Sequence, residues 1–214
     1  MTETALLSLG SNVGDRLDTL TAAVYALDDI DGLTVEDVSG VYETAPWPPP
    51  SEPGGVEQPS FYNLVVRART TLEPVDLLRE TQLVEAAFGR DRDREVRWGP
   101  RTLDVDLLLV GDRELATPEL TLPHPRLTER AFVLVPLLEV LPGGTLPDGQ
   151  RITAVLARLA PIEGIDLVVR LDDVPTRRVP RPEGPVGPPA TTERPGTEEV
   201  AREHGADPER GSRS

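Results

Sequence analysis

The pattern of apolar and polar residues predicts a strand followed by a helix at the start of the chain. Residues 5–9 form a short apolar run that ends in Gly10-Ser11-Asn12, as a buried strand followed by a turn does. Residues 17–27 then place leucine and valine on one helical face, and Asp31-Gly32 predicts the end of this helix.

Two further strands are predicted on either side of a proline-dense loop. Residues 33–43 are rich in valine and other strand formers, and residues 61–71 alternate in the same way. The segment between them, residues 44–60, has the composition of a loop because proline and glycine interrupt every apolar run. The order so far is strand, helix, strand, strand.

A second helix and a strongly apolar strand complete the pattern. Pro74 is tolerated in the first turn of a helix over residues 75–88, and Gly89 is placed to end it. Residues 103–110 then form a strand. The order β-α-β-β-α-β predicts an α+β fold, a ferredoxin-like sandwich in which both helices pack on one face of a sheet. Apolar runs at residues 132–141 and 152–159 predict additional C-terminal helices.

The composition divides the chain into one folded domain and a tail. Residues 175–214 contain eight prolines, five glycines and no aromatic residue, so they offer little apolar surface to offset the entropy of ordering. We therefore predict a domain over residues 1–174 and a disordered tail over residues 175–214. Because the tail holds seven acidic and seven basic side chains, the net charge of -15 belongs to residues 1–174.

Charge and residue types exclude several classes of function. The acidic balance argues against nucleic-acid and anionic-membrane binding. The chain has no cysteine and no lysine, which excludes disulfides, thiolate metal sites and a P-loop kinase. No apolar stretch approaches the roughly 20 residues of a membrane span, and the N-terminus does not resemble a signal peptide. We expect a cytoplasmic protein, a monomer or weak dimer, that acts on small molecules.

Asp104 and Asp106 are the strongest candidates for chemistry. Residues two apart on a strand point to the same side, so these carboxylates project together, while Leu103, Val105, Leu107 and Leu109 form the opposite, apolar face. Such close like charges need a compensating cation, and two Mg²⁺ ions about 3.5–4 Å apart, as in phosphoryl transfer, would supply it. The alternative is a solvated strand edge with two ordinary acids.

A locally basic segment runs directly into this strand. Residues 89–101 carry five arginines against three acids, and guanidinium groups suit phosphate oxygens. The alternative is a loop whose opposite charges pair with one another in water. A basic loop that leads into an acidic strand matches the needs of a nucleoside triphosphate with Mg²⁺, so the two signals reinforce each other.

Histidine and aromatic residues are scarce enough to be informative. His124 is the only histidine before the tail and could contact phosphate, or could merely cap a rigid Pro-His-Pro turn. Phe61 and Asn63 share one strand face, and Phe132 follows Arg130 closely. A flat ligand could lie between the two rings, although both could equally be core phenylalanines. The turn after the first strand needs no chemical role.

Three blocks together closely resemble the 6-hydroxymethyl-7,8-dihydropterin pyrophosphokinase family over roughly residues 4–165. The blocks are Leu9-Gly10-Ser11-Asn12, Arg97-Trp98-Gly99-Pro100-Arg101-Thr102-Leu103-Asp104-Val105-Asp106 and Leu122-Pro123-His124-Pro125. The resemblance implies transfer of diphosphate from ATP to a hydroxymethyl pterin in folate biosynthesis. It implies that Asp104 and Asp106 hold two Mg²⁺ ions and act in catalysis with Arg92 and Arg101.

The resemblance also implies two groups of binding residues. The ATP site would be formed by Glu85, Arg90, Arg92, Arg101, His124 and Arg130. In the pterin site, Phe61 and Phe132 would sandwich the ring, Asn63 and the backbone near Thr44 would bind its edge, and Trp98 would lie beside it. The chain departs from the family in two segments. Residues 47–55 lengthen the pterin-side loop, and the arginine segment is about one residue longer and has Asp93 where a basic residue would be expected.

Two other functions remain open from the sequence. Ferredoxin-like sheets with paired aspartates also serve palm-type nucleotidyltransferases, because fold and function are separable. A non-catalytic RNA-binding module of the same fold would need a basic sheet with stacked aromatic residues, which the net charge of -15 disfavours.

Overall fold

The structure is a computed structural model that describes residues 1–92, 98–141, 144–160, 162 and 164–171. Its elements in chain order are β1 (Glu3–Ser11), α1 (Arg16–Asp28), β2 (Leu33–Val38), β3 (Val41–Thr44), β4 (Phe61–Thr70), α2 (Pro74–Ala87), β5 (Asp104–Val110), β6 (Leu115–Ala116), β7 (Thr121–Leu122), the 3₁₀ helix η1 (Leu127–Glu129), α3 (Ala131–Val140), α4 (Ile152–Leu159) and β8 (Ile165–Val169). The predicted tail, residues 175–214, lies outside the described residues.

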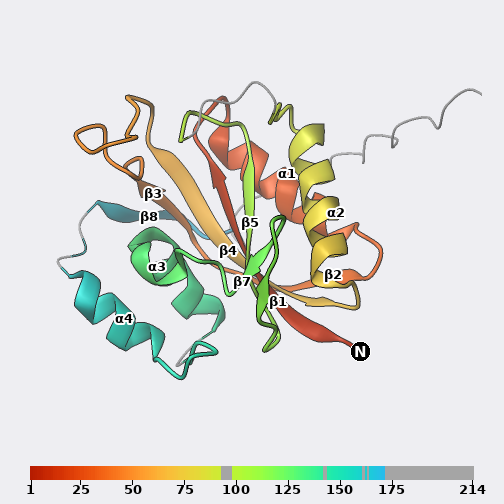
Figure 1. The fold of residues 1–214 in the computed structure, drawn as a ribbon. Coiled ribbons are helices and arrows are strands. Elements are labelled where there is room, and N and C mark those ends of the chain that lie inside the picture. Colours follow the sequence, from red (N-terminus) through yellow and green to blue (C-terminus); the bar gives the residue numbers. More distant parts are fainter. Residues whose placement is uncertain (93–97, 142–143, 161, 163, 172–214) are drawn as a thin grey trace, which may run out of the picture. The chain divides into compact units, whose positions relative to one another are not determined.

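One antiparallel sheet organises the domain (Figure 1). The strand order is β5-β1-β4-β3-β8, and β2 also pairs with β4, next to β3 along the same strand. The central pair, β1 and β4, places Gly10 opposite Asn63, and β1 places Gly10 opposite Asp104 on its other side. Residues from three strands thus form one row across the sheet, in which Gly10 lies between Asp104, at the start of β5, and Asn63 of β4.

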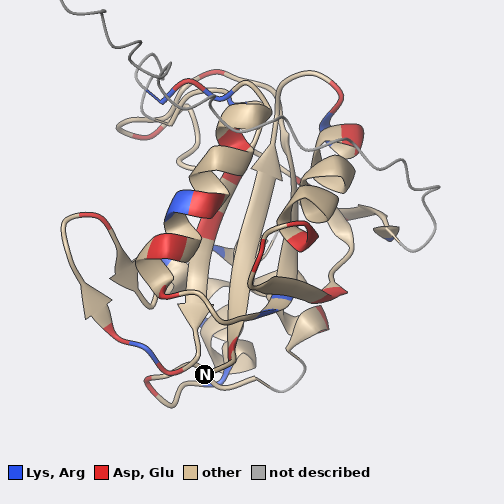
Figure 2. Ribbon diagram, turned by 90° about the vertical axis from the view of Figure 1, so that its right-hand side faces the viewer, with Lys and Arg blue, Asp and Glu red and all other residues tan. Residues whose placement is uncertain are grey.

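Helices α1 and α2 cover one face of the sheet (Figure 1). Alternate residues of β1, such as Leu7 and Leu9, pack there against Leu20 and Leu27 of α1 and Leu77 of α2. This arrangement confirms the predicted ferredoxin-like α+β sandwich. The exposed charged residues of these helices are Asp18 and Asp28 of α1 and Asp76 and Arg79 of α2. Figure 2 views the molecule from the side of these helices.

Helices α3 and α4 cover part of the opposite face and build a second core. Leu6 of β1 and Val65 of β4 pack there against Leu134 and Leu137 of α3 and Ile152 of α4. The predicted additional helices therefore exist, and they enclose the side of the sheet on which the candidate residues lie. Among the described residues, no helix is both long and apolar enough to cross a bilayer.

The strand predicted over residues 33–43 is in fact two strands. Ser39 and Gly40 separate β2 from β3, and Ser39 is buried at the break. The Ser39 hydroxyl accepts a hydrogen bond from the Val65 backbone N–H at 2.9 Å and donates one to the Gly40 carbonyl at 2.8 Å. The side chain thus stands in for a backbone acceptor, so β2 and β3 both continue along β4 with a shift in register.

The alternation predicted for β5 is correct for its first half and wrong at Leu109. The register with β1 shifts between Leu6 and Leu7, which pair with Leu109 and Leu107, so Leu108 is an extra residue. As a result both Leu108 and Leu109 pack in the core under α3, while Leu107 packs in the core under α1 and α2. The bulge lies beyond the two aspartates and leaves their shared orientation intact.

Candidate active site

A cavity opens on the α3 side of the sheet, where β1, β4 and β5 lie side by side. It is lined by Ser8, Gly10, Thr44, Ala45, Trp47, Phe61, Asn63, Trp98, Arg101, Asp104, Asp106, Arg130 and Phe132. Nine of these residues were predicted from the sequence: Thr44, Phe61, Asn63, Trp98, Arg101, Asp104, Asp106, Arg130 and Phe132. The structure therefore gathers the candidate pterin residues, both aspartates and two of the arginines around one space.

Asp104 and Asp106 lie at the start of β5, and both line this cavity. Their neighbours on β1 are Gly10 and Ser8, which also line it. Small neighbours leave room in front of the two carboxylates, whose side chains are 26% and 33% exposed. The alternation on the strand thus produces a pair of acids that face a ligand-sized space.

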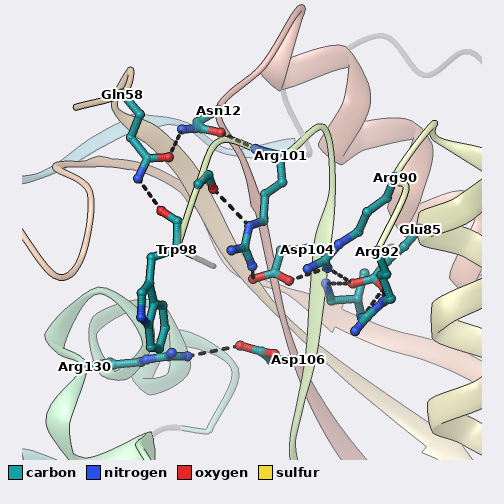
Figure 3. A network of polar contacts seen from close by, with 12 residues as sticks. Asn12, Gln58, Glu85, Arg90, Arg92, Trp98, Arg101, Asp104, Asp106 and Arg130 are labelled. Carbon is teal, nitrogen blue, oxygen red and sulfur yellow. Dashed lines mark hydrogen bonds and ion pairs between the residues drawn. The ribbon is translucent and has the colours of Figure 1, made fainter. Parts of the chain in front are cut away.

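Three arginines neutralise the two carboxylates in this structure (Figure 3). Arg101 lies 3.0 Å from Asp104 and Arg90 pairs with the same carboxylate, while Arg130 lies 3.1 Å from Asp106. Arg90 and Arg101 of the basic segment therefore pair with Asp104 of the acidic strand, whereas binding of a nucleoside triphosphate by the two segments stays a prediction. Residues 93–97 of that basic segment, Asp93 among them, lie outside the described residues.

The two aspartates differ in their electrostatic surroundings. Burial acts to raise the pKa of Asp104, but Arg101 and Arg90 outweigh it, so this pKa lies below its ordinary value. Burial and then the charge of Asp104 raise the pKa of Asp106 to about 6, although Arg130 acts in the opposite direction. Two carboxylates at one site whose pKa values move apart are typical of functional sites.

Glu85 joins the arginines from the α2 side. Its side chain is 1% exposed, accepts a hydrogen bond from the Val105 N–H at 2.7 Å, and pairs with Arg90 and Arg92. Burial raises the pKa of Glu85 more than these cations lower it. Glu85, Arg90 and Arg92 line a second hollow with Gln82 and do not line the first cavity. The ion pair between Arg90 and Asp104 connects the two spaces.

His124 lies beside Asp106 but does not line the cavity. Its Nε2 atom is 3.9 Å from the Asp106 carboxylate, and its Nδ1 atom accepts the Arg126 N–H at 3.1 Å. Burial and the nearby Arg130 and Arg126 lower the pKa of His124 to about 4, so the ring is neutral at neutral pH. Its backbone N–H also donates to the Leu108 carbonyl at 2.9 Å. His124 thus supports the turn, which was one of the two alternatives, and its contact with phosphate stays a prediction.

The wall of the cavity formed by β3 and β4 carries buried polar side chains. Asn63 donates to the Thr44 hydroxyl at 2.8 Å, and both side chains are buried. A Cβ atom at Gly10 would lie 2.8 Å from Asn63 Oδ1, so only glycine lets the amide lie across the sheet. Phe61 and Phe132 line the same cavity from β4 and α3.

The backbone at Trp98 is held in an unusual conformation. Its φ of 65° lies in the left-handed region, which costs a bulky residue about 1–3 kcal/mol. Gln58 donates to the Trp98 carbonyl at 2.7 Å, and Gln58 in turn accepts from Asn12 at 2.9 Å. Asn12 also accepts from the Arg101 N–H at 2.8 Å (Figure 3). The turn after β1 thus positions two loops of the site without contributing chemistry.

Trp47 is a cavity residue that the sequence reasoning missed. Its ring meets that of Trp98 edge to face, with centroids 5.9 Å apart. A usable signal existed, because the chain has only two tryptophans and one of them lies in the lengthened proline-dense loop. Ser8, Gly10 and Ala45 were also missed, and nothing in their residue types points to a site.

The donor set suits Mg²⁺ when part of the coordination comes from a substrate. Among the described residues there is no group of three or more acidic or histidine side chains arranged to hold a metal alone. Two carboxylates side by side suit a hard cation that keeps phosphate oxygens and water as its other ligands. The residues present therefore fit a metal–triphosphate complex.

Comparison with known proteins identifies relatives of this chain. The family model described as 7,8-dihydro-6-hydroxymethylpterin-pyrophosphokinase (HPPK) matches residues 6–142. The 2-amino-4-hydroxy-6-hydroxymethyldihydropteridine pyrophosphokinase of Bacillus subtilis is 45% identical over 140 residues, which cover 65% of this chain and 79% of that protein. The protein of the same name from Pseudomonas aeruginosa is 39% identical over 166 residues, 78% of this chain and 97% of that one.

Solved structures agree with the fold. The wild-type HPPK-DHPS of Plasmodium falciparum superposes with a TM-score of 0.55 at 16% identity over 74% of this chain. An HPPK-DHPS in complex with substrates gives a TM-score of 0.54 at 14% identity over the same share. This chain spans less than half the length of those chains, 45% and 43% respectively, so the likeness concerns the fold of one part of them.

Proposed function

Because the chain belongs to the 7,8-dihydro-6-hydroxymethylpterin-pyrophosphokinase family, it transfers diphosphate from ATP to the hydroxymethyl group of a dihydropterin, a step of folate biosynthesis, and we propose that Asp104 and Asp106 are the centre of that transfer. The observation that supports the proposal most strongly is the shared cavity. Two aspartates, Phe61 and Phe132 line one space, so the metal–phosphate site and a slot for a flat ring adjoin each other.

We propose that Asp104 and Asp106 hold two Mg²⁺ ions together with the triphosphate. The ions would supply charge neutralisation on the transferred group, which is the main demand of phosphoryl transfer. Arg90, Arg101 and Arg130, which pair with the aspartates in this structure, lie where they can turn to phosphate oxygens once the carboxylates have other cations. Arg92 and His124 lie next to them and would complete the triphosphate site.

We propose that the pterin ring lies between Phe61 and Phe132. Asn63 and Thr44, which hydrogen-bond each other at the end of this slot, would bind the polar edge of the ring. Trp98 would close the side of the slot. In this pose the hydroxymethyl group points toward the aspartates, so its oxygen can attack the β-phosphorus in line while AMP departs.

Positioning dominates this mechanism. Bringing the hydroxymethyl oxygen and the β-phosphorus together converts an encounter of two molecules into a reaction within one complex. Thr44, Ala45 and Trp47 of one loop and Trp98 and Arg101 of the other line the cavity. We propose that these two loops, over residues 44–60 and 89–101, exclude water once both substrates are bound. The two acids that line the cavity, Asp104 and Asp106, are both paired with arginines, so we assign no general base.

The proposal is tested by Asp104→Asn and Asp106→Asn, which keep size and shape but remove charge. Each should lower turnover by about 10²–10³, the usual effect of removing one strong electrostatic element from a transition state. The assay follows ATP-dependent AMP release with hydroxymethyl dihydropterin at increasing Mg²⁺. Asp112→Asn, an exposed acid just beyond the same strand, is the matched control and should retain full turnover.

The contacts of Arg90 predict a loss of thermal stability in Asp104→Asn. Arg90 is 5% exposed and pairs with Asp104 as well as with Glu85, so Asp104→Asn leaves a buried cation with one partner fewer and should lower the melting temperature. Near-normal turnover in either folded variant would contradict the metal platform. A cytoplasmic location, where ATP is available, and a monomer or weak dimer remain part of the proposal.

A further inference from the structure

Three loops that are far apart in the sequence meet at the outer wall of the cavity. Trp47 comes from the loop between β3 and β4, Trp98 from the loop before β5, and Arg126 from the turn before η1. The Arg126 guanidinium carbon lies 4.3 Å from the centroid of the Trp98 ring and 5.5 Å from that of Trp47. These distances are within the range of cation–π contact.

The two indole rings separate an inner from an outer space. Both line the cavity that holds the aspartates, and both also line a third, more open hollow, which we call the outer hollow. Arg126 lines the outer hollow and not the cavity. Arg130 lines the cavity and not the outer hollow, with its guanidinium carbon 5.2 Å from the centroid of the Trp47 ring. Trp47 therefore contacts one cation from each side of the wall.

The surroundings of Arg126 indicate that its contact with the rings is its main interaction. Among the residues that the structure describes, Arg126 forms no ion pair, although the chain carries a net charge of -15. Its backbone is fixed, since its N–H donates to His124 Nδ1 at 3.1 Å. The cation–π contacts with Trp47 and Trp98 therefore fix the position of the Arg126 guanidinium, and the same contacts restrain the two rings.

We propose that Arg126 is a positioning residue that holds Trp47 and Trp98 together as the outer wall of the pterin slot. The inference rests on the proposed function, which places the pterin between Phe61 and Phe132 behind this wall. Arg126 joins the lengthened loop of this chain to the loop that leads into the aspartate strand, so pterin binding depends on it while nucleotide binding does not.

Binding measurements on Arg126→Ala test the proposal. The probe is 6-hydroxymethyl-7,8-dihydropterin in the presence of the α,β-methylene analogue of ATP, whose α–β linkage cannot be cleaved. We expect the Kd of the pterin to rise about 3- to 30-fold, the range that corresponds to losing one or two cation–π contacts. The Kd of the ATP analogue should stay within about twofold, and KM for the pterin should rise with little change in kcat.

Tryptophan fluorescence reports the wall directly. The chain has 2 tryptophans, and both are in the wall, so Arg126→Ala should change the emission of the free protein. Arg126→Lys keeps the charge but not the planar fork, and should give a smaller loss of pterin affinity. In a double-mutant cycle, Trp47→Leu and Arg126→Ala should cost less together than the sum of their separate losses.

Arg113→Ala, at an arginine paired with Glu3 at the far end of β1, is the matched control and should change neither Kd nor emission. Equal losses for pterin and ATP analogue, or no loss for either, would overturn the inference, as would unchanged emission. If Arg126→Ala does not fold, Arg126→Lys decides by the same criteria. If the unaltered chain bound neither probe, the proposed function itself would fail.

Discussion

At the scale of single residues, the site depends on side chains whose neighbours are unusually small or unusually charged. Gly10 leaves space for the Asn63 amide, and Ser8 leaves space in front of Asp106. The cations around Asp104 lower its pKa, whereas burial and the charge of Asp104 raise the pKa of Asp106. The neighbouring residues therefore determine the space around each polar side chain and the pKa of each aspartate.

Phe61→Ala should weaken pterin binding by about 1–3 kcal/mol, the range measured for bases stacked on aromatic residues. ATP binding should barely change, because Phe61 lies on the β4 side of the cavity, away from the arginines of the α2 side. Calorimetry with each ligand separately checks the prediction. Equal losses for both ligands would show that Phe61 only supports the fold.

The sequence was sufficient to predict the position of site residues that are close together on one strand. Asp104 and Asp106 face one space because side chains two apart on a strand point to the same side. Arg101 pairs with Asp104, the first residue of the strand, three positions later in the sequence. Trp47 could not be placed in the same way, since its position depends on how a long loop folds back onto Trp98. Which arginine pairs with which acid was equally beyond the sequence, because several rotamers reach the same distance.

At the scale of elements, the break between β2 and β3 depends on one hydroxyl. Ser39→Ala would leave the Val65 N–H buried without its acceptor and should lower the free energy of unfolding by about 1–3 kcal/mol. Ser60→Ala, at a serine that is not buried, is the comparison and should cost less. Denaturant titration of both variants gives the difference, and equal costs would contradict this role of Ser39.

Glu139 of α3 ties β3 and β8 to the helix. It accepts hydrogen bonds from the Tyr42 hydroxyl, from the Gly40 N–H at 2.8 Å and from Arg170 at 2.9 Å. Burial acts to raise the pKa of Glu139, but these donors outweigh it and the pKa lies below its ordinary value of 4.5. Burial and this carboxylate also raise the pKa of Tyr42 to about 12.

Glu139→Gln should therefore destabilise the domain in a pH-dependent way. A carboxylate with a lowered folded pKa stabilises fully above its unfolded value of 4.5 and loses this effect as the pH falls through the folded pKa. At pH 7 we expect a loss of about 1–2 kcal/mol, which shrinks below about pH 4.5. Glu119→Gln, at an exposed acid, is the control. A loss that did not vary with pH would argue against the charged interaction.

Element prediction succeeded where local periodicity is strong and failed where pairing is remote. The helices α1, α2, α3 and α4 begin and end within about one or two residues of their predicted positions, because apolar spacing and end signals coincide there. β8 was not predicted, since its partner β3 lies more than 100 residues earlier in the chain. The bulge at Leu108 also escaped, because a run of leucines looks the same with or without it.

At the scale of the whole molecule, we propose that the domain functions without the last forty residues. Removing residues 175–214 should leave turnover and melting temperature unchanged, because a segment rich in proline and glycine with no aromatic residue has little with which to pack. A shorter chain ending at Gly164 is the contrast, since it also removes β8 and exposes the edge of β3. A large loss from the first truncation would show that the tail contributes to the domain.

The bulge in β5 has a consequence for how substrates are bound. Because Leu107 packs into one core and Leu108 and Leu109 into the other, the strand that carries the aspartates is held from both sides of the sheet. The rotational and backbone entropy of the two carboxylates is therefore lost when the chain folds, not when ligands arrive. Substrate binding therefore does not have to order these two side chains, and the acids meet each new substrate already preorganised.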